Sequence, residues 1–157
     1  MVGRLTLLVA TVILAMNAPS GAAPRVNSDD VVQVYQVQAA FDRAASTKNL
    51  DLMMSLWYDY ATLSVGDTRG YEGKSQIRNW FATSAEAFQP QNHWVLLTAS
   101  PKIRTDIHGN RATLGFDCYY VDLATKVVKA EATVSATLAR INGKWLITDA
   151  IISPASL

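Results

Sequence analysis

The chain has 157 residues, of which 50% are hydrophobic, and its 14 basic and 13 acidic side chains give a formal net charge of +1. Because the basic residues are scattered and form no run or stripe, we expect no nucleic acid partner and no electrostatic attachment to anionic lipid. Cys118 is the single cysteine, which excludes an intramolecular disulfide, and no Cys and His cluster indicates a metal site or a cofactor.

The first 23 residues have the layout of a secretory signal peptide. Arg4 supplies the positive charge, Leu5–Met16 is an apolar run, and small residues follow up to Ala22 and Ala23. The alternative is an uncleaved anchor, but as a helix the apolar run spans only about 18 Å, whereas the hydrocarbon core of a bilayer is about 30 Å thick. We therefore expect cleavage near residue 23, a secreted or periplasmic protein, and no stable membrane anchor after cleavage.

A long helix is expected to open the mature domain, which we place at residues 27–155. Asn27 or Ser28 can cap this helix, and the acidic residues that follow suit the positive end of its dipole. Helical spacing puts on one face Val34, Gln38, Phe41 and Ala45. A second short helix is expected over 49–57, a strand over 60–66, turn residues over 67–73 and a third helix over 74–88.

The second half of the chain has the alternation of a β-sheet. Between residues 128 and 138, apolar and polar side chains alternate with a period of two, which is typical of an antiparallel strand with two unlike faces. Asn142-Gly143 is a strong hairpin signal, and residues 106–110 have turn composition. Four strands are expected over 92–103, 111–123, 126–141 and 144–152.

Helices followed by an antiparallel meander indicate an α+β fold. We expect a cone-shaped α+β barrel, in which a strongly curved antiparallel sheet wraps around three N-terminal helices. A helix that lies across such a sheet leaves a cone with an open mouth, which is a natural place for a small molecule.

Three segments of the sequence resemble the SnoaL-like proteins of the nuclear transport factor 2-like superfamily. They are STKNLDLMMSLWYDYATLS (46–64), YEGKSQIRNWF (71–81) and NGKWLITDAIISP (142–154), in that order. The resemblance covers about residues 29–154. The superfamily includes ketosteroid isomerase, scytalone dehydratase, polyketide cyclases and members with no catalytic role, so the fold does not settle the function.

The resemblance excludes the ketosteroid isomerase mechanism, because three required side chains are missing. The position of the oxyanion-hole tyrosine holds Phe41, that of the general base holds Val65, and that of the second oxyanion acid falls near Thr137. Phenylalanine cannot donate the stabilising hydrogen bond, and valine cannot accept a proton.

The dehydratases of the superfamily match the chain in part. His93 falls on their catalytic histidine, and Asp117, on the next expected strand, falls on a second polar catalytic residue. A carboxylate can orient an imidazole so that the other ring nitrogen transfers a proton. The aspartate that those enzymes keep at the end of the first helix falls at about Ser46, and their tyrosine falls at Phe41 or Ala45.

Several further side chains are candidates for contact with a ligand. Gln38 is the polar member of an apolar stripe, and it needs a partner on a ligand or on a strand. Aromatic residues that could line the cone or belong to the core are Phe41, Trp57, Tyr58, Trp80 and Tyr119. On the strand that carries Asp117, Tyr119 shares its face, while the other face carries Phe116, Cys118 and Tyr120. If the first face is concave, Asp117 lies in the cone, and otherwise it faces solvent.

Three hypotheses about function follow. The first is an exported SnoaL-like domain that binds a hydrophobic small molecule without a cofactor. The second is a cofactor-independent lyase or isomerase in which His93 is the acid/base and Asp117 its orienter. The third is a non-catalytic dimerisation or protein-interaction module, and the sequence leaves open whether the exposed sheet face forms a homodimer.

Overall fold

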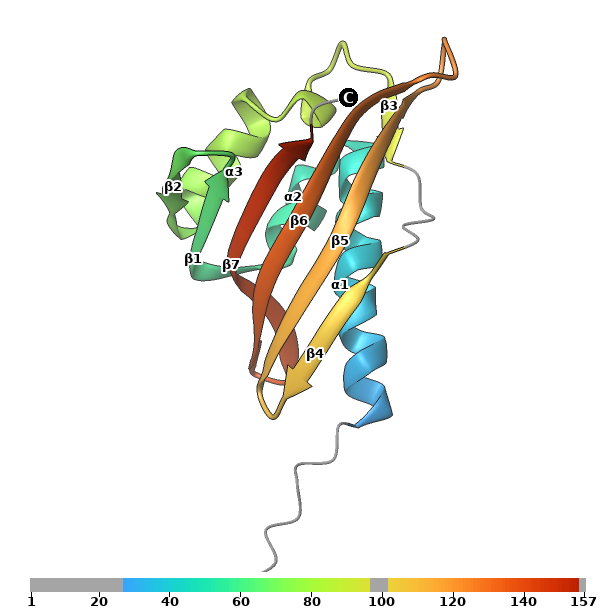
Figure 1. The fold of residues 1–157 in the computed structure, drawn as a ribbon. Coiled ribbons are helices and arrows are strands. Elements are labelled where there is room, and N and C mark those ends of the chain that lie inside the picture. The colour runs from blue at the N-terminus through green and yellow to red at the C-terminus, as the bar shows by residue number, and fades with distance from the viewer. Residues whose placement is uncertain (1–26, 97–101, 156–157) are drawn as a thin grey trace, which may run out of the picture.

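The computed structural model describes residues 27–96 and 102–155 (Figure 1), so the expected signal peptide, residues 1–23, lies outside the described residues. The elements follow in the order α1 (Ser28–Thr47), α2 (Leu50–Ser55), β1 (Trp57–Val65), β2 (Thr68–Glu72), α3 (Gly73–Thr83), η1 (Glu86–Phe88), β3 (Trp94–Leu96), β4 (Arg104–His108), β5 (Arg111–Asp122), β6 (Val128–Ile141) and β7 (Lys144–Ala155). None of the described helices is both long and apolar enough to cross a bilayer.

Helix α1 begins where its cap was predicted. The side chain of Asn27 accepts a hydrogen bond from the backbone N–H of Asp29, and the helix ends at Lys48, which takes a left-handed conformation with φ of 54°. The predicted stripe is confirmed, and one more polar residue joins it: Asp42 is buried beside Phe41. Helix α1 therefore presents two polar side chains, Gln38 and Asp42, to the interior.

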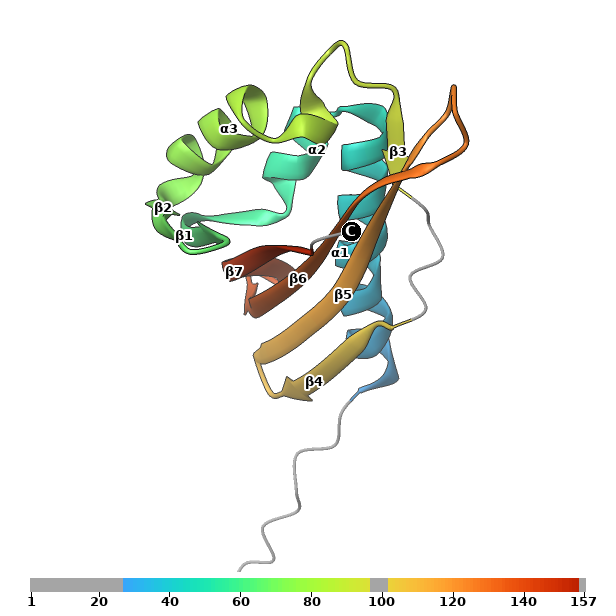
Figure 2. The same ribbon diagram turned by 45° about the horizontal axis from the view of Figure 1, so that its top comes forward.

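The third helix is shorter than predicted. Helix α3 ends at Thr83 because the N–H groups of both Ser84 and Ala85 bond to the carbonyl of Trp80, and the separate 3₁₀ turn η1 follows. The chain therefore bends away from the axis of α3 and lays η1 over the end of the sheet (Figure 2).

The sheet has the order β2-β1-β7-β6-β5-β3, and β4 also pairs with β5. Its pairs are antiparallel except β1 with β7, which run parallel, so the sheet is mostly antiparallel, as predicted, with one parallel pair. Strands joined by a hairpin must be antiparallel, but β1 and β7 are separated by most of the chain and are free to run in the same direction.

Two segments that were expected to be turns are strands. Residues 68–72 form β2, which pairs back onto β1 through the two-residue loop Gly66-Asp67. Residues 106–108 belong to β4, and the turn lies after them. The hairpin signal Asn142-Gly143 is confirmed, since both residues have the positive φ values, 51° and 77°, that a type I′ turn requires.

The helices pack on one face of the sheet and leave the other face bare. Figure 1 looks onto the bare face, with α1 behind the strands, and Figure 2 shows the same two layers from the end. The core lies between the layers, and its largest enclosed side chains include Trp57, Phe116, Met53, Leu63 and Ile77. The predicted α+β class is confirmed.

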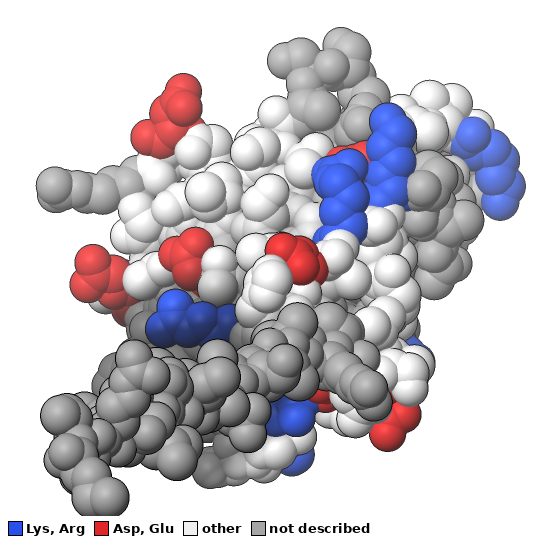
Figure 3. Space-filling model, turned by 60° about the horizontal axis from the view of Figure 1, so that its bottom comes forward, with Lys and Arg blue, Asp and Glu red and all other residues white. Residues whose placement is uncertain are grey.

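Charged side chains lie apart from one another on the molecular surface. On the face shown in Figure 3, Lys, Arg, Asp and Glu side chains are separated by large uncharged areas, and the described part of that face carries no continuous field of one sign.

Candidate functional site

A cavity of about 170 Å³, partly open to solvent, lies between the C-terminal half of α1, the α3–η1 segment and the sheet. Aromatic side chains form much of its wall: Phe41, Trp80, Phe81, Phe88, Trp94 and Tyr120. Aliphatic side chains of the strands complete it: Val65, Val134, Ile152 and Pro154. Such a concave, mostly apolar lining with few polar groups is typical of a small-molecule site.

Helix α1 contributes the floor of the cavity through Phe41 and Ala45, which lie one turn apart on its buried face. The ring of Phe41 contacts the rings of Phe81 and Phe116, with centroids 6.3 and 5.4 Å away in edge-to-face geometry. Such pairs stabilise beyond their buried area. The floor is therefore held from both the helical and the sheet side.

Two side chains donate hydrogen bonds to backbone carbonyls of the η1 segment, and one of them, Lys48, lies at the end of α1. The ammonium group of Lys48 donates to the carbonyl of Ala87 at 2.8 Å, and the amide of Gln89 donates to the carbonyl of Ala85 at 3.3 Å. Burial lowers the pKa of Lys48 from its usual value. These bonds fix a short segment that has few strand or helix partners of its own.

Strand β3 is clamped to α1 by Ser46. The hydroxyl of Ser46 accepts a hydrogen bond from the backbone N–H of Leu96 at 2.9 Å. The clamp holds Trp94, two residues earlier, against the cavity, where its ring lies 6.0 Å from the ring of Tyr120. Ser46, which the resemblance placed at the position of a catalytic aspartate, thus positions a wall of the cavity.

Strand β5 presents Cys118 and Tyr120 to the cavity, and alternation turns Tyr119 to the bare face of the sheet. Tyr119, which was predicted to contact a ligand, therefore lies outside the lining of this cavity. The choice between two adjacent tyrosines depended on which face of β5 the helices cover, and Phe116 and Cys118 take that face with Tyr120. Burial raises the pKa of the Cys118 thiol, so it stays protonated and is no nucleophile.

Gln38 and Asp42 form a buried pair behind the floor of the cavity. The side-chain amide of Gln38 donates to Oδ2 of Asp42, so Gln38 has its partner on its own helix, one turn away. Burial raises the pKa of Asp42 to about 7, and the bond from Gln38 only partly opposes this. Oδ1 of Asp42 has no hydrogen-bond partner among the described residues. The i, i+4 spacing of Gln38 and Asp42 is the signal in the sequence from which this pair could have been predicted.

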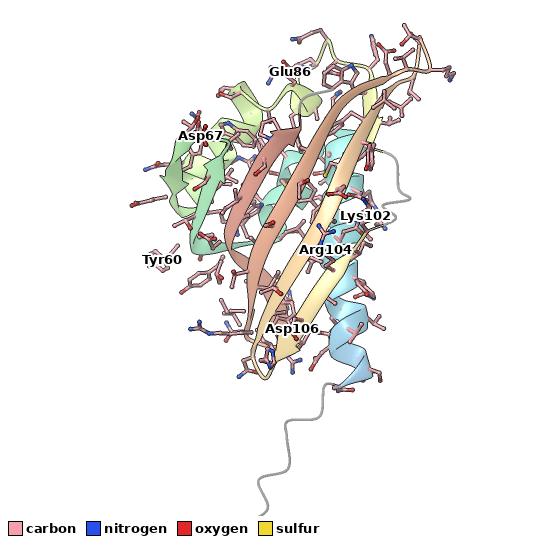
Figure 4. All side chains as sticks on the ribbon, viewed as in Figure 1. Tyr60, Asp67, Glu86, Lys102, Arg104 and Asp106 are labelled. Atoms are coloured by element: carbon pink, nitrogen blue, oxygen red, sulfur yellow. The ribbon has the colours of Figure 1, made fainter. Side chains whose placement is uncertain are left out.

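His93 lies outside the cavity. It is exposed in the loop before β3, where it lines a surface hollow with the acidic side chains of Glu86 and Asp122. Figure 4 shows Glu86 on η1 at one end of the molecule, far from Arg104 and Asp106 on β4. His93 is not among the residues that line the cavity, although Glu86 and Trp94 border both the cavity and this hollow.

Asp117 lies on the bare face of the sheet, where its carboxylate accepts a hydrogen bond from the hydroxyl of Thr133 at 3.0 Å. The backbone carbonyl of His93 bonds to Leu123, and the stretch of β5 from Asp117 to Leu123 spans about 20 Å at roughly 3.3 Å per residue. The register of β3 on β5 thus keeps His93 and Asp117 apart, and the expected dyad does not form.

Comparison with known protein families shows to which family the chain belongs. The model of the SnoaL-like domain family matches residues 27–150. The chain belongs to the SnoaL-like domain family. No curated protein gave a significant match.

Solved structures with the same fold support this SnoaL-like assignment. A Nostoc punctiforme protein of unknown function with a cystatin-like fold superposes with a TM-score of 0.72 at 16% identity, over 83% of this chain and 94% of that one. A proposed dehydratase of the NTF2-like family from Streptomyces avermitilis gives 0.67 at 14%, over 82% and 98%. A ketosteroid isomerase-like protein from Erwinia carotovora atroseptica gives 0.60 at 13%, over 83% and 100%. At such identities these structures show the fold alone.

The remaining candidates divide between the cavity and the core of this SnoaL-like domain. Phe41 and Trp80 line the cavity as expected. Trp57 is enclosed in the core, 6.1 Å from the ring of Phe81, and Tyr58 packs edge-on against Tyr60 at 5.5 Å, outside the cavity lining. Among the described residues, no three His, Cys, Asp or Glu side chains converge in a way that could hold a metal ion.

Proposed function

We propose that this SnoaL-like domain binds a small, mostly apolar molecule in its internal cavity. The observation that supports the proposal is the lining, in which aromatic rings from α1, α3, η1 and β3 face aliphatic side chains from β6 and β7. Apolar walls release water when an apolar ligand enters, and this is the main driving force for such binding.

The size of the cavity limits the ligand to roughly one ring. An apolar cavity of about 150 Å³ in another protein accommodates benzene, and the cavity here measures about 170 Å³. A compound of one six-membered ring with a short substituent suits this volume, whereas a fused steroid skeleton would require the walls to move.

Binding is favoured over catalysis by His93 because neither that predicted acid/base nor the buried carboxyl of Asp42 belongs to the cavity lining. His93 is exposed outside the cavity, and Asp42 is enclosed behind the floor. A general acid or base must come within hydrogen-bond reach of the reacting atom. A lyase or isomerase reaction in this cavity would therefore need a group other than His93.

The expected signal peptide extends the proposal to a site of action outside the cytoplasm. Expression of the full chain and N-terminal sequencing of the exported product would test this. A mature protein that begins near residue 24 supports export, and a product that retains residues 1–23 and stays inside the cell contradicts it.

The cavity can be tested by filling it from its floor. Ala45 is enclosed and lines the cavity, whereas Ala39 lies exposed on the same helix, so Ala45→Leu and Ala39→Leu are a matched pair. We expect Ala45→Leu to weaken toluene binding, followed by NMR titration, by at least about tenfold, because overpacking leaves no room for a ring. Ala39→Leu should leave it unchanged.

A second variant guards against a folding defect. Ala132→Leu would fill the cavity from the opposite wall, where Ala132 of β6 lies. Equal toluene affinity in wild type and in both cavity variants, each with a native-like NMR spectrum, would refute binding in this cavity.

A further inference from the structure

Tyr120 carries a hydroxyl group into a cavity that is otherwise lined mainly by carbon. Tyr120 pairs with Leu96 on β3 and with Ala130 on β6, so strands on both sides fix its backbone in the interior of the sheet. Its ring lies 6.0 Å from that of Trp94 at an angle of 41°. The side chain is therefore held in one place by strand pairing and by ring contact.

The hydroxyl of Tyr120 is free to bond a ligand. It makes no hydrogen bond to a described residue and is not among the fully enclosed polar atoms of that part of the structure, so it keeps some accessible surface on a residue that lines the cavity. A buried hydroxyl without a partner costs free energy, and a ligand acceptor would remove that cost.

This hydroxyl acts as a donor. Burial raises the pKa of Tyr120 above its usual value, so the hydroxyl keeps its proton throughout the neutral range. A protonated tyrosine that faces an apolar space offers one O–H bond to an acceptor atom.

The remaining polar groups of the lining indicate that the ligand is neutral. The described lining has no Lys, Arg or His side chain. Ser84 and Glu86 are exposed, and the carboxylate of Glu86 lies at the solvent side of the cavity. An anionic ligand would have no countercharge, which is strongly unfavourable in an apolar site. A neutral molecule with one acceptor oxygen meets each of these conditions.

We propose that the Tyr120 hydroxyl is the polar anchor of the cavity and selects a neutral, one-ring compound that carries a carbonyl oxygen. This inference rests on the proposed function and names the class of ligand that the same cavity prefers. The apolar walls supply most of the affinity, and the hydrogen bond from Tyr120 distinguishes a carbonyl compound from a hydrocarbon of the same shape.

The test uses acetophenone and α-methylstyrene, which differ by replacement of C=O with C=CH₂. We expect the wild-type protein to bind acetophenone about five- to tenfold more tightly, the ratio that one neutral hydrogen bond provides. Tyr120→Phe should abolish this preference while leaving the affinity for α-methylstyrene within about twofold. Tyr119→Phe is the matched control, since Tyr119 lies on the bare face of the same strand.

An infrared spectrum of bound acetophenone gives a direct second readout. The carbonyl stretch should move to lower frequency in the wild-type protein and in Tyr119→Phe, and return toward its value in hydrocarbon solvent in Tyr120→Phe. A shift that persists in Tyr120→Phe would overturn the assignment and point to the indole N–H of Trp94 as the donor.

The outcomes separate the anchor from the cavity. Equal binding of both compounds by the wild-type protein, lost in Ala45→Leu, would overturn the role of Tyr120 and leave the proposed function standing. If neither compound binds and toluene also fails to bind, both the anchor and the proposed function are refuted.

Discussion

Among the described residues three aspartates are almost enclosed, and two of them, Asp42 and Asp117, lie on opposite sides of the sheet. Asp42 is 1% exposed and Asp117 is 9% exposed. On the bare face, Asp117 accepts from Thr133 and has the guanidinium group of Arg104 at 4.0 Å. On the helix-covered face, Asp42 has one bond from Gln38 and an oxygen without a described partner.

The contrast shows that the two faces of the sheet surround a buried carboxyl group with different kinds of side chain. The bare face surrounds its carboxylate with strand hydroxyls and a nearby cation, which are polar groups that the alternation of β5 and β6 places there. The covered face offers aromatic and aliphatic neighbours and, among the described residues, no cation beside Asp42, so burial raises the pKa of Asp42 to about 7 and favours its neutral form below that pH. A cavity on the covered face is therefore suited to neutral ligands.

The largest effect is expected for Asp42. Its pKa is raised from 3.8 to about 7 in the fold, so unfolding releases a proton between these values. The contribution of Asp42 to the free energy of unfolding is fully present below about pH 4 and is lost as the pH rises toward 7. The total loss is at most about 4 kcal/mol. In Asp42→Asn the difference in unfolding free energy between about pH 5 and pH 8, measured by urea titration, should shrink by most of that amount.

Asp51→Asn is the control for this experiment, because Asp51 is exposed on α2 and pairs with Arg78 at 2.7 Å. It should keep the pH dependence of the wild-type protein. Parallel stability curves for wild type and Asp42→Asn over this pH range would show that Asp42 is already ionised in the fold and would remove the contrast between the two faces.

The local signals of the sequence were sufficient for most of the fold. Asn27 caps α1 and Asn49 caps α2 through their side chains, and Asn142-Gly143 forms the predicted hairpin. Each of these features depends only on residues that are close in the sequence, so the local sequence is enough to predict it. The strand alternation of β6 is of the same kind.

The candidate site was harder to predict because it depends on contacts between distant segments. Which of Tyr119 and Tyr120 faces inward is set by the face that α1 covers, and the distance from His93 to Asp117 is set by the register of β3 on β5. A shift of one residue moves a side chain to the other face. Asp42 was missed because the polar residue Gln38 was considered alone, without its neighbour one turn away.

A smaller effect is expected at the Asp117 side of the sheet. Thr133→Val removes the hydroxyl that donates to the buried carboxylate and should cost about 1–2 kcal/mol in unfolding free energy. Thr137→Val, on the same face of β6, is the matched control and should cost less than about 0.5 kcal/mol. Neither change should alter toluene binding, and a large loss of binding in Thr133→Val would mean that the two faces are coupled.

The smallest effect is expected at His93, whose exposed side chain lies outside the cavity. His93→Ala should change the unfolding free energy by less than about 0.5 kcal/mol and toluene affinity by less than about twofold. Trp94→Ala, the adjacent change, removes a cavity wall and should weaken binding clearly, so the two variants compare neighbouring residues outside and inside the cavity.

Toluene titrations of these two variants also decide between the hypotheses of function. If His93→Ala weakens binding as much as Trp94→Ala, the histidine must reach the ligand, and a lyase or isomerase with His93 as the acid/base becomes the better hypothesis. If only Trp94→Ala weakens binding, His93 has no part in the cavity, and the affinity for an apolar ligand rests on the aromatic wall.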